Sequence, residues 1–427
     1  KDPSIDQSLL GHTYQVVMPM TVTKVKDGHT VENTATQVTN DKRDKTNTVT
    51  NPLKEINPTK DVTVKVGGDS IDGKSVYLNH TFLYRLDSSI LPPDRAYQTV
   101  TDWGGTDQLN TEYDQYLGNW AVYASRDLYR DGQVLAAKGE KIAGSGFDSS
   151  KFGGNLFTVD ADENGKVTAD ATQAYLDLVS ADNEHEAGWR LYLQCKRIAV
   201  ADEVPNTWTE TINGQPRESN KVVTKTPDMT PSIHLEKVDT PTLKQDGQEQ
   251  ADRDDPKQAL KMDADNIGIT FIITNTSKTD PATGDGAWYK ASDLDLADST
   301  IVGDAHVDMD SLTYPDNWDT LVLKPGESVS VTGTLKGVKE GETHTDRAIV
   351  TGTPLVECAP SNGDPFNDKT DGGEDTDPEY STGDVTEIDG KQLCADTQTT
   401  SNTDDWNGYR AKPLASTGTA VLGLAGG

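Results

Sequence analysis

The sequence is poor in cysteine, in hydrophobic residues and in positive charge. Its 427 residues include three cysteines, 33% are apolar, and 70 acidic residues outnumber 39 basic ones, which gives a formal net charge of −31. A surface this acidic repels nucleic acid and anionic lipid, so we expect neither as a partner.

Enzyme motifs are also missing. The seven histidines form no HExxH motif, and there is neither a phosphate-binding glycine loop nor a serine or cysteine nucleophile signature. Pairs of carboxylates are frequent enough to arise by chance, so they do not indicate a glycosidase. We therefore expect no enzyme and no small-molecule substrate, and a secreted polysaccharide-acting enzyme is the least favoured class.

A secretory signal is missing at Lys1, where the sequence opens in a strand-like stretch. We expect a piece of a longer protein, and the missing signal then says nothing about the compartment.

Alternating apolar residues are the dominant pattern, and with seven Trp and fourteen Tyr they argue against a disordered chain. Helical periodicity is weak except in residues 170–182, where Ala171, Ala174, Tyr175 and Leu178 share one face. The sequence therefore predicts a mainly β protein of tandem immunoglobulin-like β-sandwich domains with small helices in the connections. Strands are predicted at 119–129, 188–200, 267–277 and 327–337.

An internal repeat indicates the domain organisation. Each copy reads as two adjacent strands, and the second strand carries an asparagine that is followed by a proline. Repeated closing strands mean repeated domains. The copies are VENTATQV (31–38) with KTNTVTNPL (45–53), VPNTWTETI (204–212) with ESNKVVTKTP (218–227), and the weaker HTDRAIVTGTP (344–354) with TSNTDDWNGYRAKP (400–413).

The chain is too long for one hydrophobic core, and the repeat sets the boundaries. We expect the end of a preceding domain at 1–53, a complete domain at 54–228, a second domain with an acidic insertion at 229–412, and a terminal signal at 413–427.

The cysteines fall into two groups. Cys358 and Cys394 bracket a loop rich in Gly and Asp, and in an exported protein they are a plausible disulfide, worth ~3–4 kcal/mol on the chain-entropy model. Cys195 lies in LYLQCKRI (191–198) and is predicted to be a buried thiol in a strand.

Calcium is the only cofactor that the sequence suggests. Asp160, Asp162 and Asn164 have the spacing of a calcium-binding loop, but its twelfth position is Ala171, and ENGK (163–166) also reads as a hairpin turn. The acidic stretch 363–384 offers oxygen ligands too, although its composition is more typical of a solvated loop. We expect no obligatory cofactor.

The segment 54–228 contains INPTKDVTV (56–64), SIDGKSVYLNHTFLYRL (70–86), LGNWAVYASRDL (117–128), LYLQCKRIAV (191–200) and NTWTETINGQPRESNKVV (206–223). In this order these stretches resemble the C-terminal region of streptococcal antigen I/II cell-surface adhesins. The opening segment, with VVMPMTVTK (16–24), resembles the end of that family's preceding domain. From Ser232 onward, ITFIITNTS, LKPGESVSVTG and DRAIVTG resemble instead the immunoglobulin-like repeats of Gram-positive surface proteins.

The antigen I/II resemblance implies an intramolecular isopeptide bond between lysine and asparagine side chains. Lys60 would supply the amine and Asn220 the carboxamide, which joins the first and last strands of the domain. A buried lysine is more readily neutral and nucleophilic, and a nearby carboxyl can shuttle protons. Asp102 is the expected acid and Asp107 the alternative, because WGGTDQLN departs from the family pattern here.

The repeat extends this prediction to the other domains. Asn47 would close the preceding domain. In the last domain Lys237 would pair with Asn402, with Asp346 as an alternative electrophile and Asp293 or Asp295 as the acid. The competing interpretation is a set of solvated lysines and turn asparagines.

The final stretch contains the pentad Leu414, Ala415, Ser416, Thr417 and Gly418. Its apolar flank is too short for the ~20 residues that a membrane helix needs. LASTG resembles the sortase signal, which is cleaved between Thr and Gly. We therefore expect a secreted, cell-wall-anchored, monomeric adhesin stalk of a Gram-positive bacterium, with peptidoglycan and a host or bacterial surface glycoprotein as partners. A dedicated glycoprotein- or glycan-binding module is the alternative.

Overall fold

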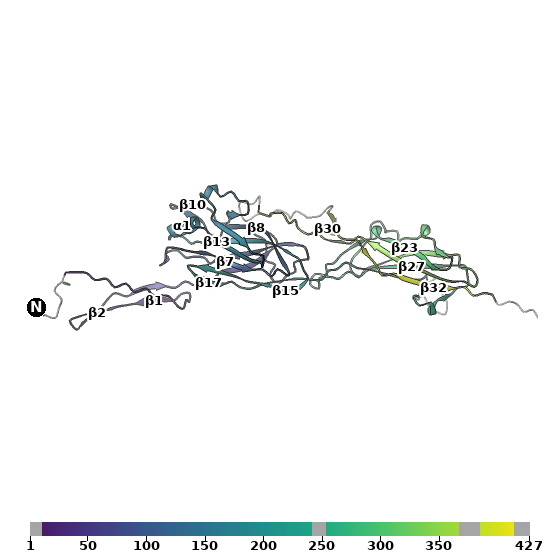
Figure 1. Ribbon diagram of the computed structural model, residues 1–427, viewed down its shortest axis with the longest axis horizontal. Coiled ribbons are helices and arrows are strands. Elements are labelled where there is room, and N and C mark those ends of the chain that lie inside the picture. The colour runs from purple at the N-terminus through teal and green to yellow at the C-terminus, as the bar shows by residue number, and fades with distance from the viewer. Residues whose placement is uncertain (1–10, 241–252, 367–384, 414–427) are drawn as a thin grey trace, which may run out of the picture.

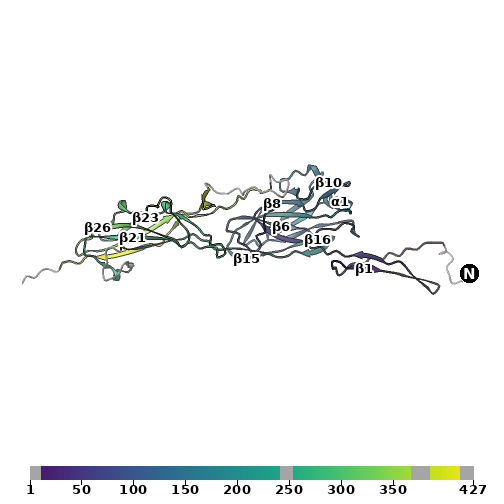
Figure 2. The same ribbon diagram turned by 180° about the vertical axis from the view of Figure 1, so that it is seen from behind.

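The computed structural model describes residues 11–240, 253–366 and 385–413. Its parts follow one another along one long axis, with the N-terminal hairpins at one end and strand β32 (Asp404–Tyr409) toward the other (Figures 1 and 2). Antiparallel strands dominate, so the predicted mainly β fold is confirmed. Among the described residues, no helix is long and apolar enough to cross a membrane.

The N-terminal segment forms two nested ladders. The outer ladder pairs β1 (Thr30–Asn33) with β4 (Val49–Pro52), and the inner one pairs β2 (Thr36–Thr39) with β3 (Lys42–Lys45). Every residue of these strands is exposed, so the segment buries no core within the described chain.

Residues 54–228 form a β-sandwich, called here the first sandwich. Aromatic side chains fill the space between its sheets, because Trp103, Trp189 and Trp208 are at most 1% exposed. One sheet has the order β11 (Lys141–Gly144), β8 (Asp114–Ala124), β14 (Trp189–Arg197), β6 (Thr81–Asp87), β5 (Thr59–Thr63). The other has the order β12 (Phe157–Ala161), β13 (Lys166–Ala171), β7 (Trp103–Gln108), β16 (Trp208–Ile212), β17 (Gln215–Glu218). The smaller elements are the ladders β9 (Leu128–Arg130) with β10 (Gln133–Ala136) and β15 (Ala201–Asn206) with β18 (Val222–Thr226), and the helices η2 (Ser150–Phe152) and α1 (Gln173–Ala181).

The first sandwich contains a cysteine, a hairpin turn and a helix for which the sequence made local predictions. Cys195 is fully buried in β14, as predicted. The turn at 162–165 joins β12 to β13 as the predicted hairpin. Helix α1 lies inside the predicted range, but it buries Tyr175, Leu176 and Val179, so the expected apolar face was partly wrong.

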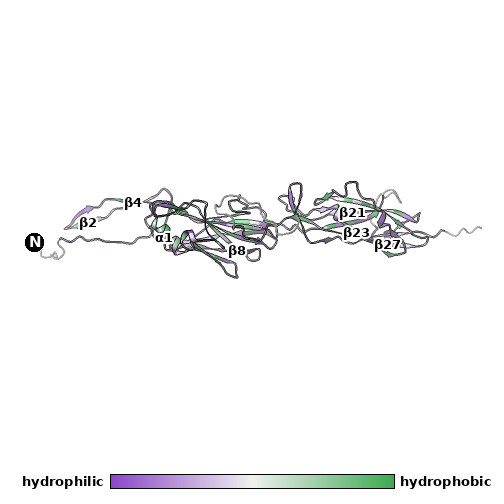
Figure 3. Ribbon diagram, turned by 90° about the horizontal axis from the view of Figure 1, so that it is seen from above, coloured by the Kyte–Doolittle hydropathy of each residue, from purple (hydrophilic) through white to green (hydrophobic). Residues whose placement is uncertain are grey.

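The described residues between 229 and 412 form the second sandwich. Its core contains Phe271 and Trp406, both fully buried, and green hydrophobic residues mark β21 in Figure 3. One sheet has the order β19 (Ile233–Asp239), β21 (Asn266–Asn275), β26 (Ser328–Lys336), β24 (His306–Val307). The other has the order β20 (Leu260–Lys261), β32, β27 (Thr343–Gly352), β23 (Asp295–Val302), and β31 (Thr399–Thr400) also pairs with β27. The smaller elements are β22 (Tyr289–Lys290), β25 (Val322–Leu323), β28 (Leu355–Glu357), β29 (Thr386–Ile388), β30 (Lys391–Ala395), η3 (Pro256–Gln258), η4 (Ala291–Asp293) and η5 (Met309–Ser311).

The sequence repeat is a repeat of strand pairing. In the first sandwich β15 pairs with β18 and β16 with β17, the same nesting as in the N-terminal segment. Asn33 lies opposite Val49 and Asn206 lies opposite Val222, so the last residue of each first strand occupies the same register position. The third copy pairs β27 with β31 and β32.

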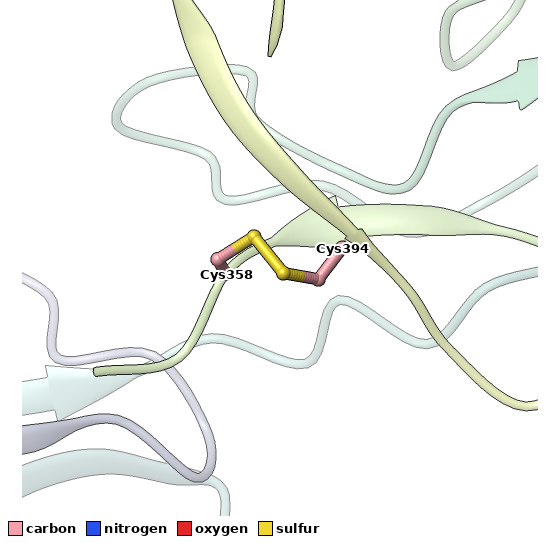
Figure 4. Close-up of a disulfide and its surroundings, with 2 residues drawn as sticks. All are labelled: Cys358 and Cys394. Atoms are coloured by element: carbon pink, nitrogen blue, oxygen red, sulfur yellow. A yellow bond between two sulfur atoms is a disulfide. The ribbon is translucent and has the colours of Figure 1, made fainter. Parts of the chain in front are cut away.

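A short segment of the second sandwich reaches back to the first. We call residues 359–366 the strap. The predicted disulfide between Cys358 and Cys394 is present at its base, where it joins β30 to the end of β28 (Figure 4). At its far end Phe366 is fully buried against a cluster of the first sandwich that includes Leu83 and Tyr192. Lys141 Nζ donates a hydrogen bond to the carbonyl of Phe366 at 2.7 Å.

A second contact between the sandwiches lies beside the linker. Ser75 donates to Asp280 at 2.8 Å, and the Tyr77 hydroxyl donates to Asp285 at 2.9 Å. A cavity of about 570 Å³ opens there, and its lining includes Tyr77 and Trp288.

Candidate functional site

Lys60 lies between the two sheets of the first sandwich. Its side chain is 0% exposed, although β5 is an edge strand. The ammonium group donates to Asp107 of β7, in the opposite sheet, and lies 4.5 Å from the centre of the Tyr84 ring. The pair therefore connects the first strand of the domain to the far sheet.

The surroundings of Lys60 favour a reactive amine. Burial lowers the pKa of Lys60, while the attraction of Asp107 opposes this shift. A lowered pKa increases the fraction of neutral, nucleophilic amine. Asp107 Oδ1 has no hydrogen-bond partner within the described chain, so this carboxyl has a free position to accept or donate a proton.

The structure places the other predicted residues of this site differently. The Asn220 side chain accepts from the Lys60 backbone N–H and donates to the Lys60 carbonyl, both at 2.8 Å. It holds the closing strand against β5. Asp102 accepts the backbone N–H of Gly214 in a turn, and no contact joins it to the Lys60 amine among the described interactions. The carboxyl beside Lys60 is Asp107.

Asn206 is a candidate that the sequence reasoning missed. It is 6% exposed, and neither the nitrogen nor the oxygen of its side chain has a hydrogen-bond partner within the described residues. Leaving such groups unpaired costs about 1–3 kcal/mol, so a buried free carboxamide calls for an explanation. The sequence repeat could have identified Asn206, because Asn33 and Asn206 hold the same position in VENTA and VPNTW.

Register brings Asn206 to the Lys60 site. Asn220 is bonded to the Lys60 backbone, and Val222, two residues further, is the partner of Asn206. Trp208, two residues after Asn206, is the strand partner of Asp107. Asn206 thus sits between the strand that carries the amine and the strand that carries the acid.

The second sandwich has a site of the same kind. Lys237 of β19 has a side chain that is 0% exposed, and its ammonium lies 2.6 Å from Asp346 of β27 and also donates to Asp298 of β23. These carboxylates belong to the opposite sheet. Burial raises the pKa of Asp298 to about 6, an effect that Lys237 opposes and the neighbouring Asp346 strengthens.

The remaining predicted partners of Lys237 lie elsewhere. Asn402 accepts from the backbone N–H of Leu235 at 2.8 Å and donates to the Leu235 carbonyl at 2.9 Å. Asp293 and Asp295 are exposed, so neither is the carboxyl that faces Lys237. Asp298 was missed, because an acidic residue in an alternating strand gives no sign that it points inward.

Asn47 is exposed between β3 and β4. Asp162 accepts the backbone N–H groups of Asn164 and Lys166 at 2.9 Å, as in a hairpin turn, and calcium binding there stays a prediction. The described residues contain no group of three or more His, Cys, Asp or Glu side chains that could hold a metal ion. The pentad 414–418 lies outside the described residues.

Serial β-sandwiches with a buried lysine between their sheets define an elongated β-domain protein. Comparison with known families identifies it further. Residues 57–227 match the family model of the cell surface antigen C-terminus, and residues 2–53 match the model of the cell surface antigen I/II C2 terminal domain. Together the matches cover more than half of the chain, which belongs to the antigen I/II family of surface adhesins.

Individual proteins are similar to parts of this chain. The aggregation substance of Enterococcus faecalis is 36% identical over 233 residues, which are 53% of this chain and 17% of that protein. The C-terminal domain of the Streptococcus pyogenes antigen I/II-family protein AspA is 28% identical, with a TM-score of 0.40 over 46% of this chain and 54% of that one. The C-terminal domain of the Streptococcus agalactiae antigen I/II polypeptide BspA is 24% identical, with a TM-score of 0.40 over 46% and 58%.

Proposed function

We propose that the chain forms the stalk of a cell-wall-anchored adhesin and that an isopeptide bond from Lys60 closes its first sandwich. The observation that carries the proposal is a lysine with a 0% exposed side chain, paired with a buried carboxyl and next to a strand position that holds an unpartnered carboxamide. Family membership supports the role at the cell surface.

The bond forms without a cofactor. The neutral Lys60 amine attacks the carboxamide carbon, the C–N bond to the amide nitrogen breaks, and ammonia leaves. Asp107 accepts a proton from the amine and delivers one to the departing nitrogen. We propose Asn206 as the electrophile, since the Asn220 carboxamide is already engaged by the Lys60 backbone at both ends.

Such a bond would change how the domain responds to force. A link from β5 to β15 joins the first strand to the closing strands, so a pull along the rod would act on a covalent bond instead of on a hydrogen-bonded ladder. Single-molecule stretching of the domain tests this role, and stepwise extension of the first sandwich at low force would contradict it.

Mass spectrometry of the intact chain tests the bond itself, because loss of ammonia lowers the mass by about 17 Da. Digestion then identifies the branched peptide as Lys60 with Asn206 or, as the family resemblance predicts, Lys60 with Asn220. Asp107→Asn should leave the chain unbonded. Lys74→Ala, an exposed lysine of the same domain, is the matched control and should retain the bond.

Wall anchoring is the second part of the proposal, and it is supported by the LASTG pentad. Incubation with a sortase and a glycine nucleophile should release the residues after Thr417 and attach the nucleophile there. A chain with Thr417→Ala is the control, and cleavage of that variant at the same place would contradict the assignment.

The cavity between the sandwiches supports a second candidate function, direct binding of a surface glycoprotein or glycan. Its lining includes Trp288 and Lys391, and such an aromatic and polar mixture suits a sugar ring. A glycan array with the chain and with Trp288→Ala distinguishes the two candidates, because a pure stalk binds no glycan in either form.

A further inference from the structure

We propose that Lys237 and Asp346 join in a lysine–aspartate amide bond that closes the second sandwich, with Asp298 as the proton-transferring carboxyl. The inference rests on the proposed function for its mechanical meaning, but its three residues lie in a different domain and in a region that neither family model covers.

Lys237 is in direct contact with both Asp346 and Asp298. The Lys237 amine lies 2.6 Å from Asp346 Oδ1 and contacts Asp298 Oδ2, and the three side chains are at most 2% exposed. Lys237 is in the first strand of the domain, whereas Asp346 and Asp298 are on the two adjacent strands β27 and β23 of the opposite sheet. A bond between Lys237 and Asp346 would therefore tie the two sheets together.

The Lys237 site contains more carboxyls than amines. One lysine faces two buried carboxyls, so full ionisation would leave an uncompensated negative charge in a site from which water is excluded. His344 also faces the site, with Nε2 3.3 Å from Asp346 Oδ2, and the Phe271 ring lies 5.5 Å from the amine. Formation of the amide consumes Lys237 and Asp346 and leaves one acid, Asp298. The site then no longer holds two carboxyls against one amine.

The strand register around Lys237 repeats the register around Lys60. In the first sandwich the Asn220 side chain accepts the Lys60 backbone N–H, and the residue two positions later is the strand partner of Asn206. In the second sandwich the Asp404 side chain accepts the Lys237 backbone N–H, and the residue two positions later, Trp406, is the partner of Asp346.

Asp346 therefore holds the position that Asn206 holds in the first sandwich. The closing residue also corresponds, since Asp404 replaces Asn220. Four positions of one bonding site thus recur in the second domain, with an acid where the first domain has an amide and with Asp298 in place of Asp107.

The condensation of Lys237 with Asp346 needs no added reactant. Neutral Lys237 attacks the carboxyl carbon of protonated Asp346, the new C–N bond forms, and the C–OH bond breaks to release water. Asp298 takes a proton from the amine and gives one to the leaving hydroxyl. The raised pKa of Asp298 lets this group exchange protons near neutral pH.

Digestion of the wild-type chain and mass spectrometry test the proposal. We expect a branched peptide that joins Lys237 to Asp346 and is lighter by about 18 Da than its two parts, from loss of water. Linear peptides with free Lys237 and free Asp346 would overturn the inference. The Lys60 peptides from the same digest report on the first sandwich separately, so either bond can fail alone.

Variants sharpen the test. Asp346→Ala should abolish the branched peptide, and Asp298→Asn should leave Lys237 unbonded in the folded chain. Asp346→Asn should restore the bond by loss of ammonia and give the same product mass as wild type. Asp293→Ala, an exposed acid of the same region, is the control, and loss of the bond in it would contradict the assignment of Asp298.

Discussion

The two sandwiches place a lysine in the same part of their fold but surround it differently. In the first sandwich Lys60 meets one carboxyl, and the nearby register position holds a carboxamide, Asn206. In the second sandwich Lys237 meets two carboxyls, Asp298 and Asp346. The fold fixes where the amine lies, and the facing strand decides which small molecule its condensation would release.

The first sandwich contains a second buried ion pair, in which Arg197 Nε donates to Asp114 at 2.8 Å and the Tyr84 hydroxyl donates to the same carboxyl, also at 2.8 Å. The guanidinium further donates to Thr224 and Thr226 of the closing strand β18. The first domain thus anchors its last strand to its central sheet through polar groups.

Removal of that anchor should give the largest effect. Arg197→Met leaves the Asp114 carboxylate buried without its partner, and we expect the first sandwich to lose about 3–5 kcal/mol of unfolding free energy. Scanning calorimetry should show one transition shifted down and the transition of the second sandwich unchanged. Arg347→Met breaks an exposed pair with Asp405 and is the control, with an expected loss of at most about 1 kcal/mol.

Loss of the disulfide should rank next and act on the second sandwich. Cys358 and Cys394 close a loop with a sequence separation of 36, so the double serine variant should cost about 3–4 kcal/mol on the chain-entropy model. Urea denaturation followed by the fluorescence of Trp288, which lies in the same small cluster as β28 and β30, measures the loss. An unchanged midpoint would show that the native contacts alone fix this loop.

Truncation of the strap anchor should have a slightly smaller effect, and it should couple the two domains. Phe366→Ala removes the ring that the strap buries against the first sandwich. We expect the free energy of docking the strap on that sandwich to weaken by about 3 kcal/mol. Hydrogen exchange at Lys141 and Gln194, on the face that receives the strap, should accelerate. Protection that stays at the wild-type level would show that the strap does not cover this face in solution.

The smallest expected effect depends on pH and tests whether Asp404 corresponds to Asn220. Burial raises the pKa of Asp404 to about 7, with the acids Asp254 and Glu236 adding to the shift. The folded state therefore binds a proton that the unfolded state has released between about pH 4 and 7, so stability falls as the pH rises through this window. Asp404→Asn should remove this dependence.

At pH 8 we expect Asp404→Asn to stabilise the second sandwich by about 1–2 kcal/mol and at pH 4 to change little. Thermal unfolding at both values measures the difference, with Asp405→Asn, its more exposed neighbour, as the control. Destabilisation at pH 8 would contradict the correspondence with Asn220.

The sequence predicted the fold well for identifiable reasons. Period-two alternation marks the core strands, the cysteine spacing marked the disulfide, and the paired motifs indicated repeated domains. Lys60 could be named because the antigen I/II resemblance implies it, and Lys237 because the repeat extends that assignment to the last domain. The helix face was partly wrong because a helix of nine residues offers few positions on which to establish a period.

The facing acids could not be predicted in the same way. Asp298 lies in DLDLADS, where several acids alternate, and only the register of β23 against β27 shows which one points inward. Asp102 and Asp107 posed the same problem in the first sandwich. Asn206 could have been predicted, since Asn33 holds the same position in the N-terminal copy of the repeat. The asparagine of the closing strand, Asn220, was assigned as the electrophile instead. The strap contact depends on a loop that docks on another domain and has no sequence signal.

The strap also determines how the two sandwiches can turn relative to each other. A single linker between Thr226 and Ile233 would leave the domains free to swivel, as beads on a string. The contact beside the linker and the attachment of Phe366, which is displaced from the linker, together oppose rotation about the long axis as well as bending. The two sandwiches then behave as one rigid arm. Such an arm fixes both the distance between its two ends and the orientation of one end relative to the other.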